Sequence, residues 1–111
     1  MTLISLNAYG PDFQVKVLSS LLNNKEFLLN IHDILSEEYF DNQAHKWVVQ
    51  QILKYYDKYH TVPTLEVLKV ELKRVENEVL QVSIKEQLRL SLDTLSSDSK
   101  FVEEEFSTFC K

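Results

Sequence analysis

The segment that decides the fold runs from Tyr39 to Leu72 and reads YFDNQAHKWVVQQILKYYDKYHTVPTLEVLKVEL. It predicts a long helix that begins at Asp41, because a carboxylate there accepts hydrogen bonds from the free amides of the first turn. Pro63 disfavours helical backbone at the residue before it, so this helix is expected to end near His60. Thr64 is then expected to cap a second helix.

The long helix is apolar over much of its circumference. One stripe has helical spacing and consists of Ala44, Val48, Ile52, Tyr55 and Tyr59. The residues Trp47, Val49, Leu53 and Tyr56 widen that stripe beyond one face. A helix that is apolar on several sides normally has neighbours on several sides. The sequence therefore predicts that this helix is central and that Trp47 is buried.

Two further helices are predicted upstream. Pro11 and Asp12 favour a helix start, since Pro lacks an amide that would be unpaired there and Asp faces the positive end of the dipole. The first helix is expected to bury Phe13, Val17, Leu18, Leu21 and Leu22 and to end at Asn23-Asn24. The second is expected over 25–35, with the inward stripe Phe27, Leu28, Ile31, Ile34 and Leu35. A short turn over 36–38 then leads Tyr39 and Phe40 into the core.

Downstream, two amphipathic helices flank the polar turn 96–99. The first covers 77–95 and the second begins at Lys100, which predicts an αα-hairpin. Two arms alone cannot bury both apolar faces, and exposed apolar patches usually mark an interface. The expected self-association or partner-binding residues are Ile84, Leu88, Leu92, Leu95, Phe101, Val102 and Phe106. The alternative is that the hairpin folds back on the bundle and the protein is a monomer.

Length and composition indicate an all-α protein. A chain of 111 residues with Gly 1 and Pro 2 has few residues for tight turns, which favours helices joined by short links. We expect a compact multi-helix bundle over 1–76, followed by the helical hairpin over 77–111 as part of the same domain. Because the second arm stops in mid-pattern at Lys111, the chain is expected to be truncated at that end. The alternative is a natural, frayed C-terminus.

The sequence offers little chemistry. With one glycine it has no phosphate-binding loop, and its only cysteine, Cys110, cannot form a disulfide or a cysteine-based metal site within one chain. The pair Asp41 and His45 is better explained by helix capping than by metal binding. We therefore expect no catalytic residue, no metal, no cofactor and no enzymatic activity. No apolar run reaches the ~20 residues of a membrane span, and no signal peptide is visible, so a cytoplasmic location is expected.

The charge argues against nucleic acid as the main partner. The net charge is -5, and no basic tail or patch stands out. A solvated helix face explains Lys46, Lys54 and Lys58. Core packing, with one hydroxyl reaching water, explains the tyrosine cluster Tyr55, Tyr56 and Tyr59 better than base stacking does.

These residues together resemble the N-terminal domain of DnaB-like replicative helicases, most closely the T-even-like bacteriophage type. The resemblance is carried by YFDNQAHK from Tyr39, by residues 52–59 and by HTVPTLEVL from His60. The segments FQVKVLSSLL from Phe13 and FLLNIHDIL from Phe27 support it. It covers residues 9–75 well, and the remainder fits only as a helical hairpin in the corresponding place.

The resemblance implies a non-catalytic collar on a hexameric motor. In that family the hairpin pairs with a neighbour's hairpin and the collar contributes to primase contact. The ATPase and DNA-translocating machinery lies in a separate C-terminal domain. On this interpretation the partners are further copies of the chain, as a dimer or as a hexamer in a full-length helicase in the bacterial host cytoplasm, and primase. Direct nucleic-acid binding and membrane contact are not expected.

Two other functions remain open from the sequence. One is a stand-alone helical adaptor or regulator that binds a protein partner through the hairpin. The other is a single-strand-binding protein, whose affinity would fall steeply with salt. The acidic balance makes the second of these the weakest.

Overall fold

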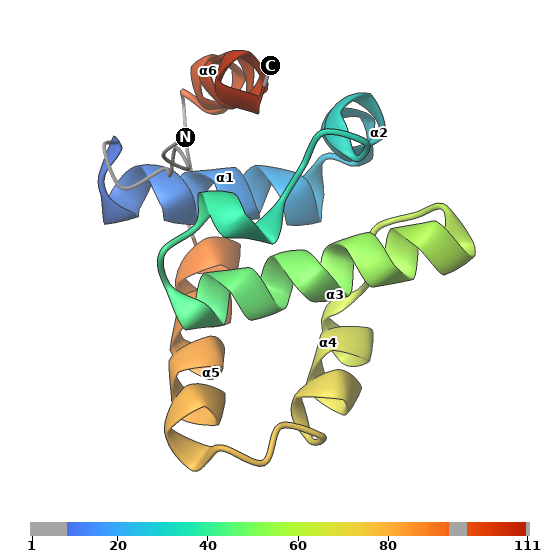
Figure 1. Ribbon diagram of the computed structural model, residues 1–111, viewed down its shortest axis with the longest axis vertical. Helices are drawn as coiled ribbons and strands as arrows, with labels where there is room; N and C mark the ends of the chain where they lie inside the picture. Colours follow the sequence, from blue (N-terminus) through green and yellow to red (C-terminus); the bar gives the residue numbers. More distant parts are fainter. Residues whose placement is uncertain (1–8, 94–97, 111) are drawn as a thin grey trace.

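The described residues of the computed structural model, 9–93 and 98–110, contain six α-helices, one turn of 3-10 helix and no β-strand (Figure 1). This confirms the predicted all-α class. The helices are α1 (Pro11–Asn23), α2 (Lys25–Ile31), α3 (Gln43–Tyr59), α4 (Leu65–Leu72), α5 (Glu78–Asp93) and α6 (Ser99–Cys110), and the 3-10 turn is η2 (Glu37–Tyr39).

Helix α1 is the element that most of the others contact. Its residues Val17, Leu18 and Leu21 are fully buried. Helices α2, α3, α5 and α6 all pack on it, and α5 also packs along α3. In Figure 1 α6 lies above α1, whereas α3 and α5 lie below it. One hydrophobic core therefore joins residues from all six helices.

The helix boundaries follow from local capping. Pro11 occupies the first turn of α1, as predicted. Asn24 ends α1 and caps α2, since its side chain accepts a hydrogen bond of 3.3 Å from the Phe27 amide. Thr64 caps α4 as predicted, by accepting from the Val67 amide.

The predicted cap of the long helix was wrong by one residue. Asn42, not Asp41, is the N-cap of α3, and its Oδ1 lies 2.8 Å from the Ala44 amide and 3.4 Å from the His45 amide. An N-cap side chain bonds to amides two and three residues ahead. Because α3 begins at Gln43, only Asn42 stands at that distance.

The second helix is shorter than predicted. It ends at Ile31 instead of Leu35, because the amides of Ile34 and Leu35 both bond to the carbonyl oxygen of Ile31 and close the chain into a turn. This turn still directs Leu35 into the core, and η2 then delivers the fully buried Phe40. Four residues of the predicted stripe are thus buried and Ile34 is half-buried, although the helical extent of the segment was wrong.

Helix α3 has neighbours on several sides, as its composition predicts, because it packs against α1, α5 and η2. Its C-terminal part extends past α1 and α5 (Figure 1), so Tyr59 is exposed and Tyr55 is half-buried, while Tyr56 takes the inward position. Trp47 is half-buried and packs against the edge of the core. The prediction of a buried Trp47 was therefore wrong, and α1 and α3 both contribute to the centre of the bundle.

The predicted αα-hairpin is not formed as two arms that pack on each other. Helices α5 and α6 each direct their apolar face to α1, from opposite sides (Figure 1). Packing on α1 buries the apolar face of α5 and the apolar face of α6. Two helices that packed only on each other could not bury both faces fully. The turn at 96–97 and Leu95 lie outside the described residues.

Helix α6 is held to α1 and α2 by polar contacts as well. Lys16 Nζ lies 2.9 Å from Asp98 Oδ2, directly before α6. The side-chain amide of Asn24 donates to both carboxylate oxygens of Glu103, each at 3.2 Å. These contacts fix α6 on its own chain at both the α1 side and the α2 side.

A buried histidine joins α3 to α5. His45 is only 2% exposed, and its Nε2 lies 2.7 Å from Gln87 Oε1 on α5. Its Nδ1 is buried without a hydrogen-bond partner among the described residues. Burial lowers the pKa of His45, an effect that the Gln87 hydrogen bond partly opposes. Burial in the folded chain therefore favours the neutral form of this imidazole.

We expect the stability of the fold to decrease in mild acid because of His45. The folded-state pKa lies below the ordinary value of 6.5, so the unfolded chain takes up the proton first as pH falls. The contribution of neutral His45 to the free energy of unfolding is complete above pH 6.5 and is lost progressively as the pH falls below it. Urea unfolding at about pH 7.5 and about pH 5.5 should show a larger loss for the wild type than for His45→Gln. Equal losses would contradict the buried neutral state.

The position of α6 predicts unequal effects of its buried Phe106 and its exposed Phe101. Phe106 is fully buried, with its ring centroid 6.2 Å from that of Phe27 and 6.1 Å from that of Phe40. We expect Phe106→Ala to reduce the free energy of unfolding by about 3–5 kcal/mol, because it opens a cavity. The matched control Phe101→Ala, on the exposed side, should change it by less than about 0.5 kcal/mol. Equal effects in urea titrations would contradict this packing.

Candidate protein-docking surface

The seven residues predicted to mediate self-association do not share one surface. Ile84, Leu88, Val102 and Phe106 are buried in the chain's own core. Leu92 is 40% exposed and Phe101 is 59% exposed. Leu95 lies outside the described residues. Only Leu92 and Phe101 of this set are therefore available to another molecule in the structure as it stands.

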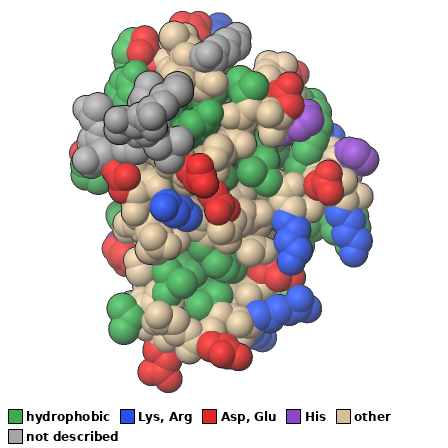
Figure 2. Space-filling view, viewed as in Figure 1, with side chains coloured by type: hydrophobic (Ala, Val, Ile, Leu, Met, Phe, Trp, Pro, Cys, Tyr) green, Lys and Arg blue, Asp and Glu red, His purple; other side chains and the backbone are tan. Residues whose placement is uncertain are grey.

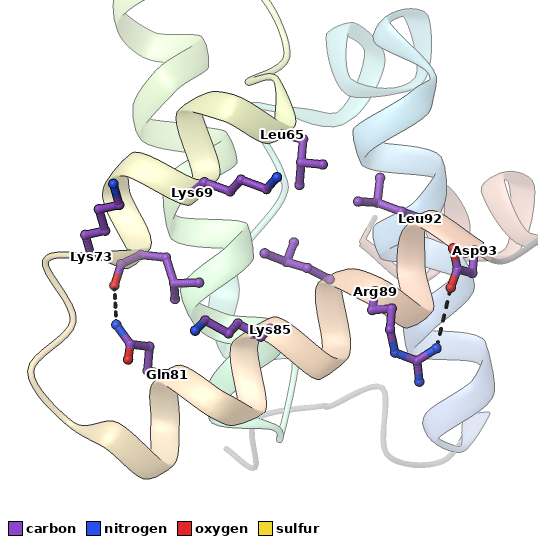
Figure 3. A pocket seen from close by; sticks show the side chains of 10 residues that line it. Leu65, Lys69, Lys73, Gln81, Lys85, Arg89, Leu92 and Asp93 are labelled. Atoms are coloured by element: carbon purple, nitrogen blue, oxygen red, sulfur yellow. Dashed lines mark hydrogen bonds and ion pairs between the residues drawn. The ribbon is translucent and has the colours of Figure 1, made fainter.

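Leu92 belongs to an apolar groove between α4 and α5. The groove has a volume of about 510 Å³ and its floor consists of leucines from both helices. These leucines are Leu65 and Leu72 on α4 and Leu88 and Leu92 on α5. Figure 3 shows that Leu65 and Leu92 point into the groove from the two opposite helices. Figure 2 shows the corresponding apolar patch between these helices, in the lower half of the molecule.

The groove arises because α4 and α5 do not pack closely against each other. Helix α5 packs along α3 and α1 through buried residues such as Ile84, while α4 is short and joined to α3 by the Pro63 turn. One end is bridged by Gln81, whose Nε2 donates to the carbonyl oxygen of Leu72 at 3.1 Å (Figure 3). The same carbonyl oxygen also accepts a hydrogen bond from the Val75 amide at 3.1 Å, so it has two donors at the end of α4.

The rim of the groove is basic, although the chain is acidic. Lys69 and Lys73 come from α4, and Lys85 and Arg89 come from α5. Arg89 forms two ion pairs on its own helix, from Nη2 to Glu86 Oε1 at 2.6 Å and from Nη1 to Asp93 Oδ2 at 3.5 Å. The three lysines form no ion pair with any residue in the described part of the chain. An apolar floor with unpaired cations on its rim suits an amphipathic segment that carries acidic residues.

The sequence contained a signal for this groove that was not used. On α5 the positions of Gln81, Lys85, Leu88 and Leu92 are spaced by four, three and four, which is one helix face. On α4 the positions of Leu65, Lys69 and Leu72 have the same kind of spacing. The sequence alone does not show that these two faces lie opposite each other. The residues that connect α4 to α5 carry no pattern that predicts the angle between the two helices.

A second hollow lies between α3 and α4 and involves the tyrosines. Tyr55 and Tyr59 have ring centroids 4.6 Å apart, and Lys58 Nζ lies 5.2 Å from the Tyr59 centroid. Lys54 and Arg74 also line this hollow. Core packing, as predicted for the tyrosine cluster, applies to Tyr56 but not to Tyr59, which is exposed.

The histidines and the cysteine do not assemble into a reactive site. Within residues 9–93 and 98–110 no group of three or more histidine, cysteine or acidic side chains is arranged to hold a metal ion. His32 stacks near Tyr56, with centroids 4.5 Å apart, and His60 is the C-cap of α3 in a left-handed conformation. Burial raises the pKa of the Cys110 thiol to about 12, so it is protonated at neutral pH.

None of the helices in the described part of the chain has the length and apolar character needed to cross a membrane.

The groove predicts that two leucines one turn apart respond differently to the same change. Leu88 is only 5% exposed, so Leu88→Asp places a charge in the core and should destabilise the fold by about 4 kcal/mol or more. Leu92→Asp leaves the new carboxylate at the open side of the groove and should cost less than about 1 kcal/mol. Thermal or urea unfolding measures both. Similar losses for the two variants would show that Leu92 belongs to the core.

Comparison with known proteins identifies the family. The family model described as DnaB-like helicase N terminal domain matches residues 10–103. The match includes α1 to α5 and the first part of α6. Comparisons with curated proteins and with solved structures find no match.

Proposed function

The chain belongs to the family of DnaB-like helicase N-terminal domains, and from this membership we propose that it is the non-catalytic collar of a replicative DNA helicase. In this role it mediates self-association and docks primase or another replication protein. The observation that carries the proposal is the match of the family model across residues 10–103. Its all-α fold and its exposed apolar side chains are in keeping with an assembly module.

The finer features of the proposal come from the sequence. The segments YFDNQAHK and HTVPTLEVL favour the T-even-like bacteriophage type, which would place the protein in the cytoplasm of a bacterial host. In a full-length helicase, the ATPase machinery would reside in a separate C-terminal domain. The collar would then contribute subunit contacts, as a dimer or within a hexamer, and leave catalysis to that domain.

We propose that self-association uses the outward residues of α5 and α6. Four of the seven residues that the sequence predicts for self-association are buried in the chain's own core and are not accessible. Leu92 and Phe101 are accessible and apolar, so burying them between two chains removes apolar surface from water. Association through so few residues is expected to be weak, in the micromolar range or above, because it must offset the entropy of association.

Light scattering over a concentration series tests this function. The wild-type chain should rise from its monomer mass of 13.1 kDa toward at least twice that value as its concentration increases. Phe101→Asp should shift the rise to at least about tenfold higher concentration, because a charge replaces an apolar contact. The matched control is Val70→Asp on α4, which makes the same chemical change at another exposed apolar residue that does not line the groove.

A wild-type chain that stays at the monomer mass throughout would contradict the proposed self-association. Loss of association in Val70→Asp as large as in Phe101→Asp would show that the effect is one of charge and not of the α6 surface.

A further inference from the structure

We propose that the exposed face of α6 in one copy of the chain docks into the α4–α5 groove of a second copy, with Phe101 on the leucine floor and Glu104 against the lysine rim. This inference rests on the proposed self-association and identifies the two surfaces that make it.

The groove defines what its occupant must carry. Its floor of four leucines needs an apolar side chain, and its unpaired Lys69, Lys73 and Lys85 need acidic groups. Along α5 it extends from Gln81 to Leu92, which at the helical rise is about 17 Å. An occupant of two to three helical turns therefore fits its length.

The outward face of α6 carries this combination. Phe101, Glu104 and Thr108 are exposed and spaced by three and four residues, which places them on one side of the helix. They span about 10 Å along the helix axis. The opposite side carries Val102 and Phe106, which are buried and hold α6 on its own chain. This apolar and acidic face therefore belongs to a helix that is already packed on its own chain. Binding does not have to supply the free energy of ordering it.

The contact has to form between copies and not within one. Helix α6 packs on α1 and α2, whereas the groove lies between α4 and α5. In Figure 1 these two sites are at opposite ends of the molecule. A chain therefore cannot fill its own groove with its own α6. Two different surfaces meeting in this way make a heterologous contact, which produces rings or open filaments.

The charges favour a second copy as the occupant. The groove rim concentrates cations on a chain whose net charge is -5, and α6 holds the acidic run Glu103 to Glu105. Each copy thus offers a basic groove and an acidic helix, and pairing them matches unlike charges. The two accessible residues of the predicted association set, Leu92 and Phe101, also fall one on each surface.

A complementation experiment tests the inference. Leu92→Asp blocks the groove and keeps α6, and Phe101→Asp alters α6 and keeps the groove. Each variant alone should stay at the monomer mass at concentrations where the wild type associates. An equimolar mixture should recover a species of about twice 13.1 kDa, because the intact α6 of one variant fits the intact groove of the other. The mass should not rise further, since the remaining surfaces of that dimer are both altered.

The matched control is a mixture of Leu92→Asp with Leu65→Asp, two variants that block the same groove. Both residues are exposed, so both variants are expected to fold, which circular dichroism verifies. This mixture should stay monomeric. A mixture of Leu92→Asp and Phe101→Asp that also stays monomeric, while the wild type associates, would overturn the groove docking and leave self-association intact. A wild type that never associates would overturn both.

Charge reversal gives an independent readout. Lys85→Glu should weaken association by roughly two- to fivefold, the effect of an exposed ion pair. Adding Glu104→Lys in the same chain should restore it, because every contact then pairs the reversed charges. Association of the double variant no stronger than that of Lys85→Glu would contradict the assigned pairing.

Discussion

Burial of α1 is the constraint on which the rest of the structure depends. Val17, Leu18 and Leu21 are fully buried because α3, α5 and α6 approach α1 from different directions. Each of those helices has one strongly apolar face, and α1 is where these faces meet. The two C-terminal helices are consequently separated by α1. They do not pair with each other, and their outward sides are left to solvent or to a partner.

The groove follows from the same constraint. Because α5 directs Ile84 and Leu88 toward the core shared with α1 and α3, only its flank faces α4. The short α4 is held at its start by the Thr64 cap and at its end by the hydrogen bond from Gln81 to Leu72, so the two helices stand apart over an apolar floor. The groove is thus a consequence of the packing of α5 on α1 and α3, which leaves α4 apart from α5.

Local features of this fold were predictable from the sequence, and its tertiary arrangement was not. The helix starts at Pro11 and Thr64 depend on residues a few positions apart. Helical periodicity predicts most of the buried positions of α1 and α2, although Phe13 and Leu22 are only half-buried. Two local details were wrong, namely the cap of α3 and the end of α2. The larger errors arose where tertiary packing decides. The apolar composition of α3 predicted packed aromatic residues up to its end, but its C-terminal part extends past α1 and α5, which leaves Tyr59 exposed.

The candidate site shows the same division between local and tertiary information. Amphipathic patterns identified α5 and α6 as interaction helices but did not distinguish the face that packs on α1 from the face left open. Phe106 and Phe101 have equally apolar side chains, and only the position of α1 and α2 determines that the first is buried and the second is exposed. The unpaired lysines of the groove were overlooked because their significance depends on two helices lying opposite each other.

The most direct test of this account is a nuclear Overhauser measurement on α6 in a sample that mixes labelled and unlabelled chains. The account predicts that the Phe106 ring shows contacts to the rings of Phe27 and Phe40, 6.2 Å and 6.1 Å away between centroids, and that these contacts are within one chain. Contacts from Phe106 to the apolar face of α5, or contacts that occur only between chains, would show that α6 forms a hairpin or a swapped interface. Either result would contradict the packing of both helices on α1.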